Sequence, residues 1–182
     1  MPNAREIIDQ LSHYQALTIL RELAAGDEQL AGRIAELGTA CLSKVDVEEV
    51  AAALYDELDD LEVEEVWDRA GKTRHGYVDT SEAACQMVEE VIDPYLEQLK
   101  KYQKLGMSTE ANTLCMGLLL GLYQFERKSK SEFKNWAVDA PGAFASTIMD
   151  AWKAGRPGRQ DVAAIKRLIG DELGNWGAHL VS

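Results

Sequence analysis

Apolar residues recur every three or four positions along almost the whole chain, and alternation between apolar and polar residues never lasts more than a few positions. The first spacing is typical of amphipathic helices, and the second of half-buried strands. Helix start signals, in which a capping residue is followed three positions later by Glu, precede several apolar stripes. These pairs are Asn3 with Glu6, Asp46 with Glu49, and Asp79 with Glu82. The pattern therefore predicts an all-α protein.

Glycines and polar breaks divide the pattern into about eight helices joined by short turns. We expect stacked antiparallel hairpins, as in helical repeats or an α-solenoid, within a single domain over residues 1–182. The helices are expected from Asn3 to Gly26, from Asp27 past Leu37, over 46–61 and 63–67, from Asp79 to Leu105, over 108–127, and at about 141–154 and 160–173.

The turn at Gly106 is so short that residues 88–105 should lie antiparallel to residues 114–125. The second of these segments is apolar on several sides, so we expect it at the centre of the fold. Its buried residues should include Leu118. Pro94 lacks a backbone N–H, and we expect it to bend the preceding helix or to start a new one capped by Asp93.

The 182 residues include 19 basic and 31 acidic residues, for a net charge of −12. Such a charge opposes general attraction to nucleic acid or to anionic membranes. Three unpaired cysteines and an N-terminus without an apolar signal segment favour a cytoplasmic protein with free thiols. We therefore expect no disulfide and no membrane-spanning segment.

Charge is unevenly distributed along the chain. Residues 46–65 hold ten acidic residues and no basic one, whereas residues 127–167 hold nine basic and four acidic residues. These segments are either two solvated faces of opposite sign or a docking surface for a charged partner or a second copy of the chain.

A glycine-bounded loop at residues 71–79, with the positions just before it, combines cations with aromatic side chains. Such a combination can bind acidic groups. Alternatively, the aromatic rings anchor the loop on the helices while the cations are only solvated. The candidate binding residues are Trp67, Arg69, Lys72, Arg74, His75 and Tyr77.

Signals for a catalytic, metal or cofactor site are weak. The three histidines, His13, His75 and His179, have no spacing typical of metal ligands. Cys85 and Cys115 lie on apolar stripes, where cysteine usually packs as a small hydrophobic residue. The tripeptide at residues 71–73, Gly-Lys-Thr, lacks the glycine and the preceding strand of a phosphate-binding loop. We expect no metal, no cofactor and no enzymatic activity.

One long segment nevertheless resembles a known family. The run from Asp68 to Asp79, the following Glu82-Ala83-Ala84, Pro94-Tyr95-Leu96 and residues 117–126 are similar to a helical region of bacterial proteins that carry a SWIM-type zinc finger. The resemblance covers roughly residues 45–150 and implies a helical module. The finger's Cys-x-Cys and Cys-x-His pairs do not occur in this chain, so zinc binding is not implied.

These observations favour a helical interaction or scaffold module that docks another protein or a second copy of itself. The alternative is a nucleic-acid-associated protein that uses the basic segment 127–167, and this would show steeply salt-dependent binding. An enzyme would require a pocket that joins Arg69, Arg74 and Tyr77 to a buried carboxylate such as Glu126.

Overall fold

A computed structural model describes residues 3–73 and 76–181 of the protein. Within these residues the chain forms nine α-helices and two three-residue strands, which confirms the all-α prediction. The sequence predicted a single domain over residues 1–182, whereas the internal contacts group into two compact units, residues 1–44 and residues 45–182. We describe each unit by itself.

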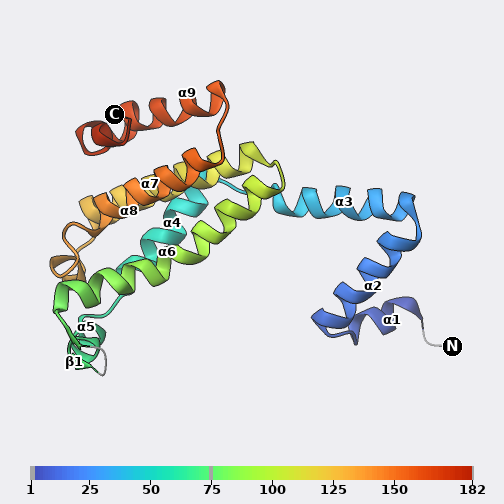
Figure 1. Ribbon diagram of the computed structural model, residues 1–182, viewed down its shortest axis with the longest axis horizontal. Helices are drawn as coiled ribbons and strands as arrows, with labels where there is room; N and C mark the ends of the chain where they lie inside the picture. Colours follow the sequence, from blue (N-terminus) through green and yellow to red (C-terminus); the bar gives the residue numbers. More distant parts are fainter. Residues whose placement is uncertain (1–2, 74–75, 182) are drawn as a thin grey trace. The chain divides into compact units, whose positions relative to one another are not determined.

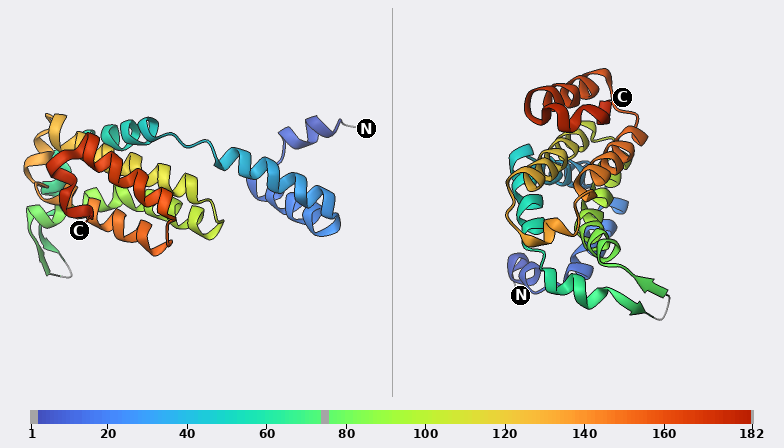
Figure 2. Two further views of the ribbon diagram at one scale, coloured as in Figure 1. Left: turned by 90° about the horizontal axis from the view of Figure 1, so that it is seen from above. Right: turned by 90° about the vertical axis from the view of Figure 1, so that its left-hand side faces the viewer.

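The first unit consists of α1 (Ala4–Asp9), α2 (His13–Gly26) and α3 (Glu28–Leu42). The prediction of one helix from Asn3 to Gly26 is wrong, because a second capping box divides it: Ser12 accepts the backbone N–H of Gln15, whose side chain in turn accepts the N–H of Ser12. Asp27 alone joins α2 to α3, which pack together as a helical hairpin (Figure 2).

The second unit contains the remaining helices and a β-hairpin (Figure 1). Short 3₁₀ segments lie at Glu132–Asn135 and Gly174–Val181, and a π-helical turn lies at Ile169–Leu173. In chain order the main elements are α4 (Val47–Asp59), α5 (Val63–Arg69), β1 (Gly71–Thr73), β2 (Gly76–Val78), α6 (Thr80–Lys104), α7 (Ser108–Lys128), α8 (Ala140–Ala154) and α9 (Arg159–Leu168).

The apolar helix α7 lies at the centre of the second unit, as its sequence predicted. It packs against α4, α6, α8 and α9, in an arrangement compatible with a helical bundle (Figure 1). Its turn with α6 forms the expected helical hairpin, in which Gly106 adopts a φ of +70°. The side chains that form the centre of the core are at most 2% exposed, and they are Leu114, Leu118, Leu122 and Phe125.

Two glycines on one side of α7 allow α4 to approach closely. A Cβ atom placed on Gly117 would lie 2.6 Å from the Cβ of Val50, and one placed on Gly121 would lie 2.9 Å from the backbone oxygen of Ala51. Residues four apart share a helix face, so both glycines lie along the same line of contact. The contact between α4 and α7 therefore requires these positions to lack side chains.

Pro94 does not end the helix in which it lies, although a break at this position was one of the expected outcomes. Helix α6 continues from Thr80 to Lys104 with Pro94 inside it, and no new helix starts after Asp93. Pro94 is exposed. On that side, water can bond the backbone carbonyl that a proline leaves without an intrahelical partner.

Residues 71–79 were expected to form a loop. In their described part they form a small antiparallel β-hairpin. Gly71 pairs with Val78, Lys72 with Tyr77 and Thr73 with Gly76. Gly71 and Gly76 have φ values of +106° and +138°, which residues with a side chain rarely adopt. These conformations explain why glycines bound the segment, a signal that the loop interpretation missed.

The residues that follow the helix expected at about 160–173 do not form an unstructured tail. The chain instead turns through the π-helical and 3₁₀ segments, and Leu180 is 3% exposed. The indole N–H of Trp176 donates to a carboxylate oxygen of Glu126 on α7. Glu126 thus holds the C-terminal segment against α7.

Candidate interaction surfaces

The predicted binding constellation lies at the end of α5 and on the β-hairpin. Arg69 is held by carboxylates: its Nη1 lies 2.7 and 2.8 Å from the two carboxylate oxygens of Glu90 on α6, and its Nη2 lies 3.6 Å from Glu65 Oε2. The hydrogen bond to Glu90, with the charges of both carboxylates, raises the pKa of Arg69. Arg69 therefore connects α5 to α6 through its carboxylate partners, whereas the structural alternative expected the cations to be only solvated.

The structural alternative also required the aromatic rings to anchor the segment on the helices. Both rings are instead exposed. Trp67 is 54% exposed and meets Trp136 edge-on, with ring centroids 6.5 Å apart, while Tyr77 is 76% exposed and pairs in register with Lys72. Arg74 and His75 lie outside the described residues. A binding role for the six residues stays a prediction.

Part of the acidic segment 46–65 has structural roles. Asp46 caps α4 by accepting the backbone N–H groups of Glu48 and Glu49, and Asp59 accepts the hydroxyl of Ser129 beyond α7. Burial, together with the charge and hydrogen bond of Glu57, raises the pKa of Tyr95 from 10.0 to about 12. These contacts tie α4 to its neighbours, so the segment is more than a solvated face.

The basic segment 127–167 does not gather at one place. Arg127 and Lys128 close α7, and Lys153 closes α8. The chain traverses the 15 residues of α8 between these groups, a length of about 22 Å. Lys166 and Arg167 lie in the last turn of α9, so the cations of the segment are distributed over the ends of three helices.

A basic hollow that the sequence analysis missed lies between the C-terminal ends of α6 and α8. It has a volume of about 630 Å³. Lys100 on its wall contacts Glu97 at 2.7 Å, and their hydrogen bond raises the pKa of Lys100 and lowers that of Glu97. The residues that line the hollow are Glu97, Lys100, Lys101, Gln103, Lys104, Ala154 and Gly155.

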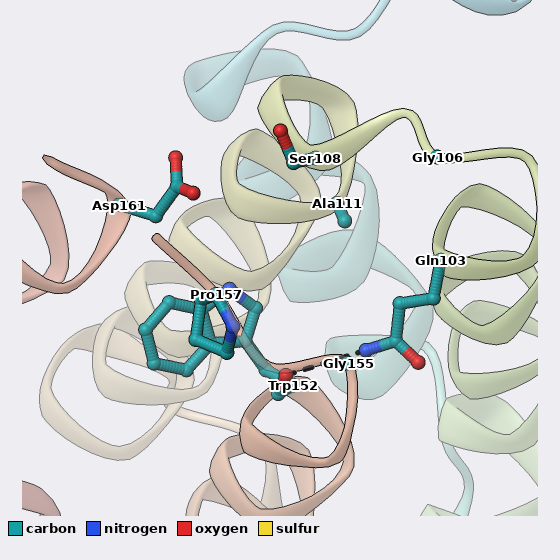
Figure 3. Close-up of a pocket in the computed structure, with 8 residues that line it drawn as sticks. All are labelled: Gln103, Gly106, Ser108, Ala111, Trp152, Gly155, Pro157 and Asp161. Carbon is teal, nitrogen blue, oxygen red and sulfur yellow. Dashed lines mark hydrogen bonds between the residues drawn. The ribbon is translucent and has the colours of Figure 1, made fainter. Parts of the chain in front are cut away.

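A smaller cavity lies where α6, α7, α8 and α9 meet (Figure 3). Its volume of about 90 Å³ is below the roughly 300–1,000 Å³ of small-molecule sites. The side-chain amide of Gln103 donates to the backbone oxygens of Ala151 and Trp152 at the end of α8, and Asp161 accepts the backbone N–H of Gly158. These polar groups therefore cap helix ends.

Burial raises the pKa of the Cys115 thiol, and it is also the main cause of the raised pKa of Cys85, so both are poor nucleophiles. Within residues 3–73 and 76–181, no group of three or more His, Cys, Asp or Glu side chains is placed to hold a metal ion. No helix in the same ranges is both long and apolar enough to cross a membrane.

Most of the large apolar side chains that are exposed in the described part of the chain lie on the first unit. None of its described side chains is buried, although it holds nine of the chain's thirteen large apolar residues found exposed in the described part. Contiguous apolar patches mark interaction sites, whereas isolated exposed apolar residues are ordinary. We name six of the nine the N-terminal apolar face: Tyr14, Leu17, Leu20 and Leu23 on α2, with Leu30 and Leu37 on α3.

The leucines of the N-terminal apolar face are between 41% and 53% exposed. Intermediate values of this kind arise because each helix of a two-helix hairpin covers only one side of its partner's apolar stripe. In the sequence alone, a spacing of three or four positions is also that of buried helix positions. Only the number of neighbouring helices distinguishes the two outcomes.

Comparisons with models of protein families, with curated proteins and with solved structures found no match to this chain. The resemblance to the helical region of SWIM-type zinc-finger proteins therefore stays an expectation. The candidate surfaces have to be interpreted from their own geometry and chemistry.

Proposed function

We propose that this chain is a non-enzymatic interaction module that docks a protein chain on its N-terminal apolar face. The observation that supports the proposal is the contrast between the two units. The second unit encloses a core around α7, whereas the first presents half-exposed leucines on both helices of its hairpin. Burying such leucines against a partner is favourable by about 25 cal/mol for each Å² of apolar surface removed from water.

A capture experiment tests this proposal. The immobilised full-length chain is expected to retain a defined protein, which can be the chain itself, and a variant with Leu20→Glu and Leu37→Glu is expected to lose it. Leu105→Glu is the matched control, because Leu105 is 54% exposed in the second unit and Leu37 is 53% exposed in the first. Retention of the same proteins by all three chains would contradict the proposal.

A second candidate function is binding of a nucleic acid or another polyanion. It is favoured by the hollow between α6 and α8, where Lys101 and Lys104 accompany Lys100. Phosphate contacts by such lysines would weaken steeply with salt. Gel-shift titrations at low salt should then show binding that Lys101→Ala with Lys104→Ala reduces, and no shift at low salt would exclude this function.

A further inference from the structure

We infer that the partner on the N-terminal apolar face is a second copy of this chain, so that two helical hairpins form a four-helix interface. This inference rests on the proposed function and specifies its partner. It concerns only the first unit, α2 and α3 with the preceding α1, and four observations support it.

The first observation is the lack of a core within the unit. No described side chain of residues 3–44 is buried. A unit of about 40 residues rarely folds without disulfides, metals or association with another chain. Two more helices of similar length would cover the open sides of the leucines, because four helices are the usual number that enclose a shared apolar core.

The second observation concerns helix length. Helices α2 and α3 contain 14 and 15 residues and are joined by Asp27 alone. In a two-fold symmetric dimer the same patch of each copy faces the other. A second hairpin with helices of the same length covers the first from end to end.

The third observation is the apolar area available. Nine large apolar residues of the unit are between 41% and 77% exposed. A standard interface buries roughly 800 Å² on each partner, and exposed apolar side chains in this number contribute to an area of that order. Six of these nine residues form the N-terminal apolar face, and they therefore supply the larger part of the apolar surface available to a second copy.

The fourth observation is charge. Residues 1–44 contain four basic and six acidic residues and carry −2, whereas the other 138 residues carry −10 of the total of −12. A self-complementary interface brings like charges together, and such contacts oppose association. The first unit thus carries less net negative charge than the second, and its net charge opposes self-association less.

Light scattering coupled to gel filtration tests the inference on the full-length chain. We expect a mass of twice 20.1 kDa for the wild type and for the Leu105→Glu control. Leu37→Glu should raise the dissociation constant on the order of 100-fold or more, because an unpaired carboxylate would be buried in the interface. All four tryptophans lie in the second unit, so unchanged tryptophan fluorescence would show that this unit stays folded in the variant.

A thiol probe gives a second, independent readout. Cys41 is exposed and follows Leu37 by four positions, so it lies on the same side of α3. Its reaction with a maleimide should be severalfold slower in the wild type than in Leu37→Glu, and the difference should shrink when the wild type is diluted into monomers.

Three outcomes would overturn the inference. A wild-type chain that stays monomeric at all concentrations would show that no dimer forms. A dimer that Leu37→Glu leaves intact would show that the chain dimerises through another surface. If a monomeric wild type still captures a different protein in a manner that depends on Leu20 and Leu37, the proposed function stands and only its partner is wrong. A monomer without such capture refutes both.

Discussion

Leu118 is fully buried at the centre of α7, where the helix has neighbours on several sides. Replacing it with alanine removes apolar contacts and leaves a cavity. We expect Leu118→Ala to lower the free energy of unfolding by about 2–5 kcal/mol, measured by urea denaturation followed by tryptophan fluorescence. A loss well below this range would mean that the surrounding helices can collapse into the space.

Gly121 contributes to stability because it lacks a side chain, which lets the backbone of α4 lie directly against α7. Its added Cβ would meet the backbone oxygen of Ala51 at 2.9 Å, and backbone cannot move aside as a flexible side chain can. Gly121→Ala should therefore destabilise the protein by about 1–3 kcal/mol through overpacking. The measurement is again the urea midpoint.

Gly142 is the control for that substitution. It also lies within a helix, α8, but a Cβ there meets no atom within 4 Å. Gly142→Ala should stabilise the protein by about 0.4–1 kcal/mol, because alanine restricts the unfolded chain. Equal effects of the two substitutions on the urea midpoint would show that the close contact with α4 does not determine the stability of the protein.

Tyr95 predicts a pH dependence that arises from one contact between α6 and α4. In the folded protein its pKa is raised to about 12 by burial and by Glu57, whereas the unfolded value is near 10. The folded state thus keeps a proton that the unfolded state loses, and the stability from this group disappears as the pH rises from 10 to 12. Urea midpoints should fall over that window, and less so in Tyr95→Phe.

At the scale of the element, Arg69 decides how α5 and the β-hairpin are attached to α6. Its ion pair with Glu90 is half-exposed, and pairs of this kind contribute about 0–1 kcal/mol. We expect Arg69→Ala to leave the thermal midpoint nearly unchanged while amide hydrogen exchange in residues 71–73 and 76–78 becomes faster. A large drop in the midpoint would instead show that the pair holds the whole second unit together.

The helix boundaries show which local sequence signals are enough to predict where a helix begins. Asp46 and Asp79 cap helices where the sequence predicted them, because capping depends on a few adjacent residues. Pro94 and the segment at 71–79 were harder to predict. Whether a proline breaks a helix depends on the exposure of the carbonyl that it leaves unbonded, and whether glycines bound a loop or a hairpin depends on their φ angles.

At the scale of the whole molecule, the division at Lys44 and Val45 implies that the second unit is stable without the first. A chain of residues 45–182 should keep the tryptophan fluorescence and thermal midpoint of the full-length protein, because the described core side chains all lie in this range. Loss of cooperative unfolding in the shortened chain would show that the two units share one folding transition.

The sequence by itself determined the helical class, most helix boundaries and the central position of α7. These properties follow from the periodicity of apolar residues and from capping, both of which are local. Only the tertiary structure decided that Leu37 is half-exposed, although its spacing suits a buried helix position, and that Arg69 binds Glu90 rather than facing a ligand. The physical reason is that periodicity assigns a residue to a face of its helix, whereas burial and pairing depend on how many other elements cover that face.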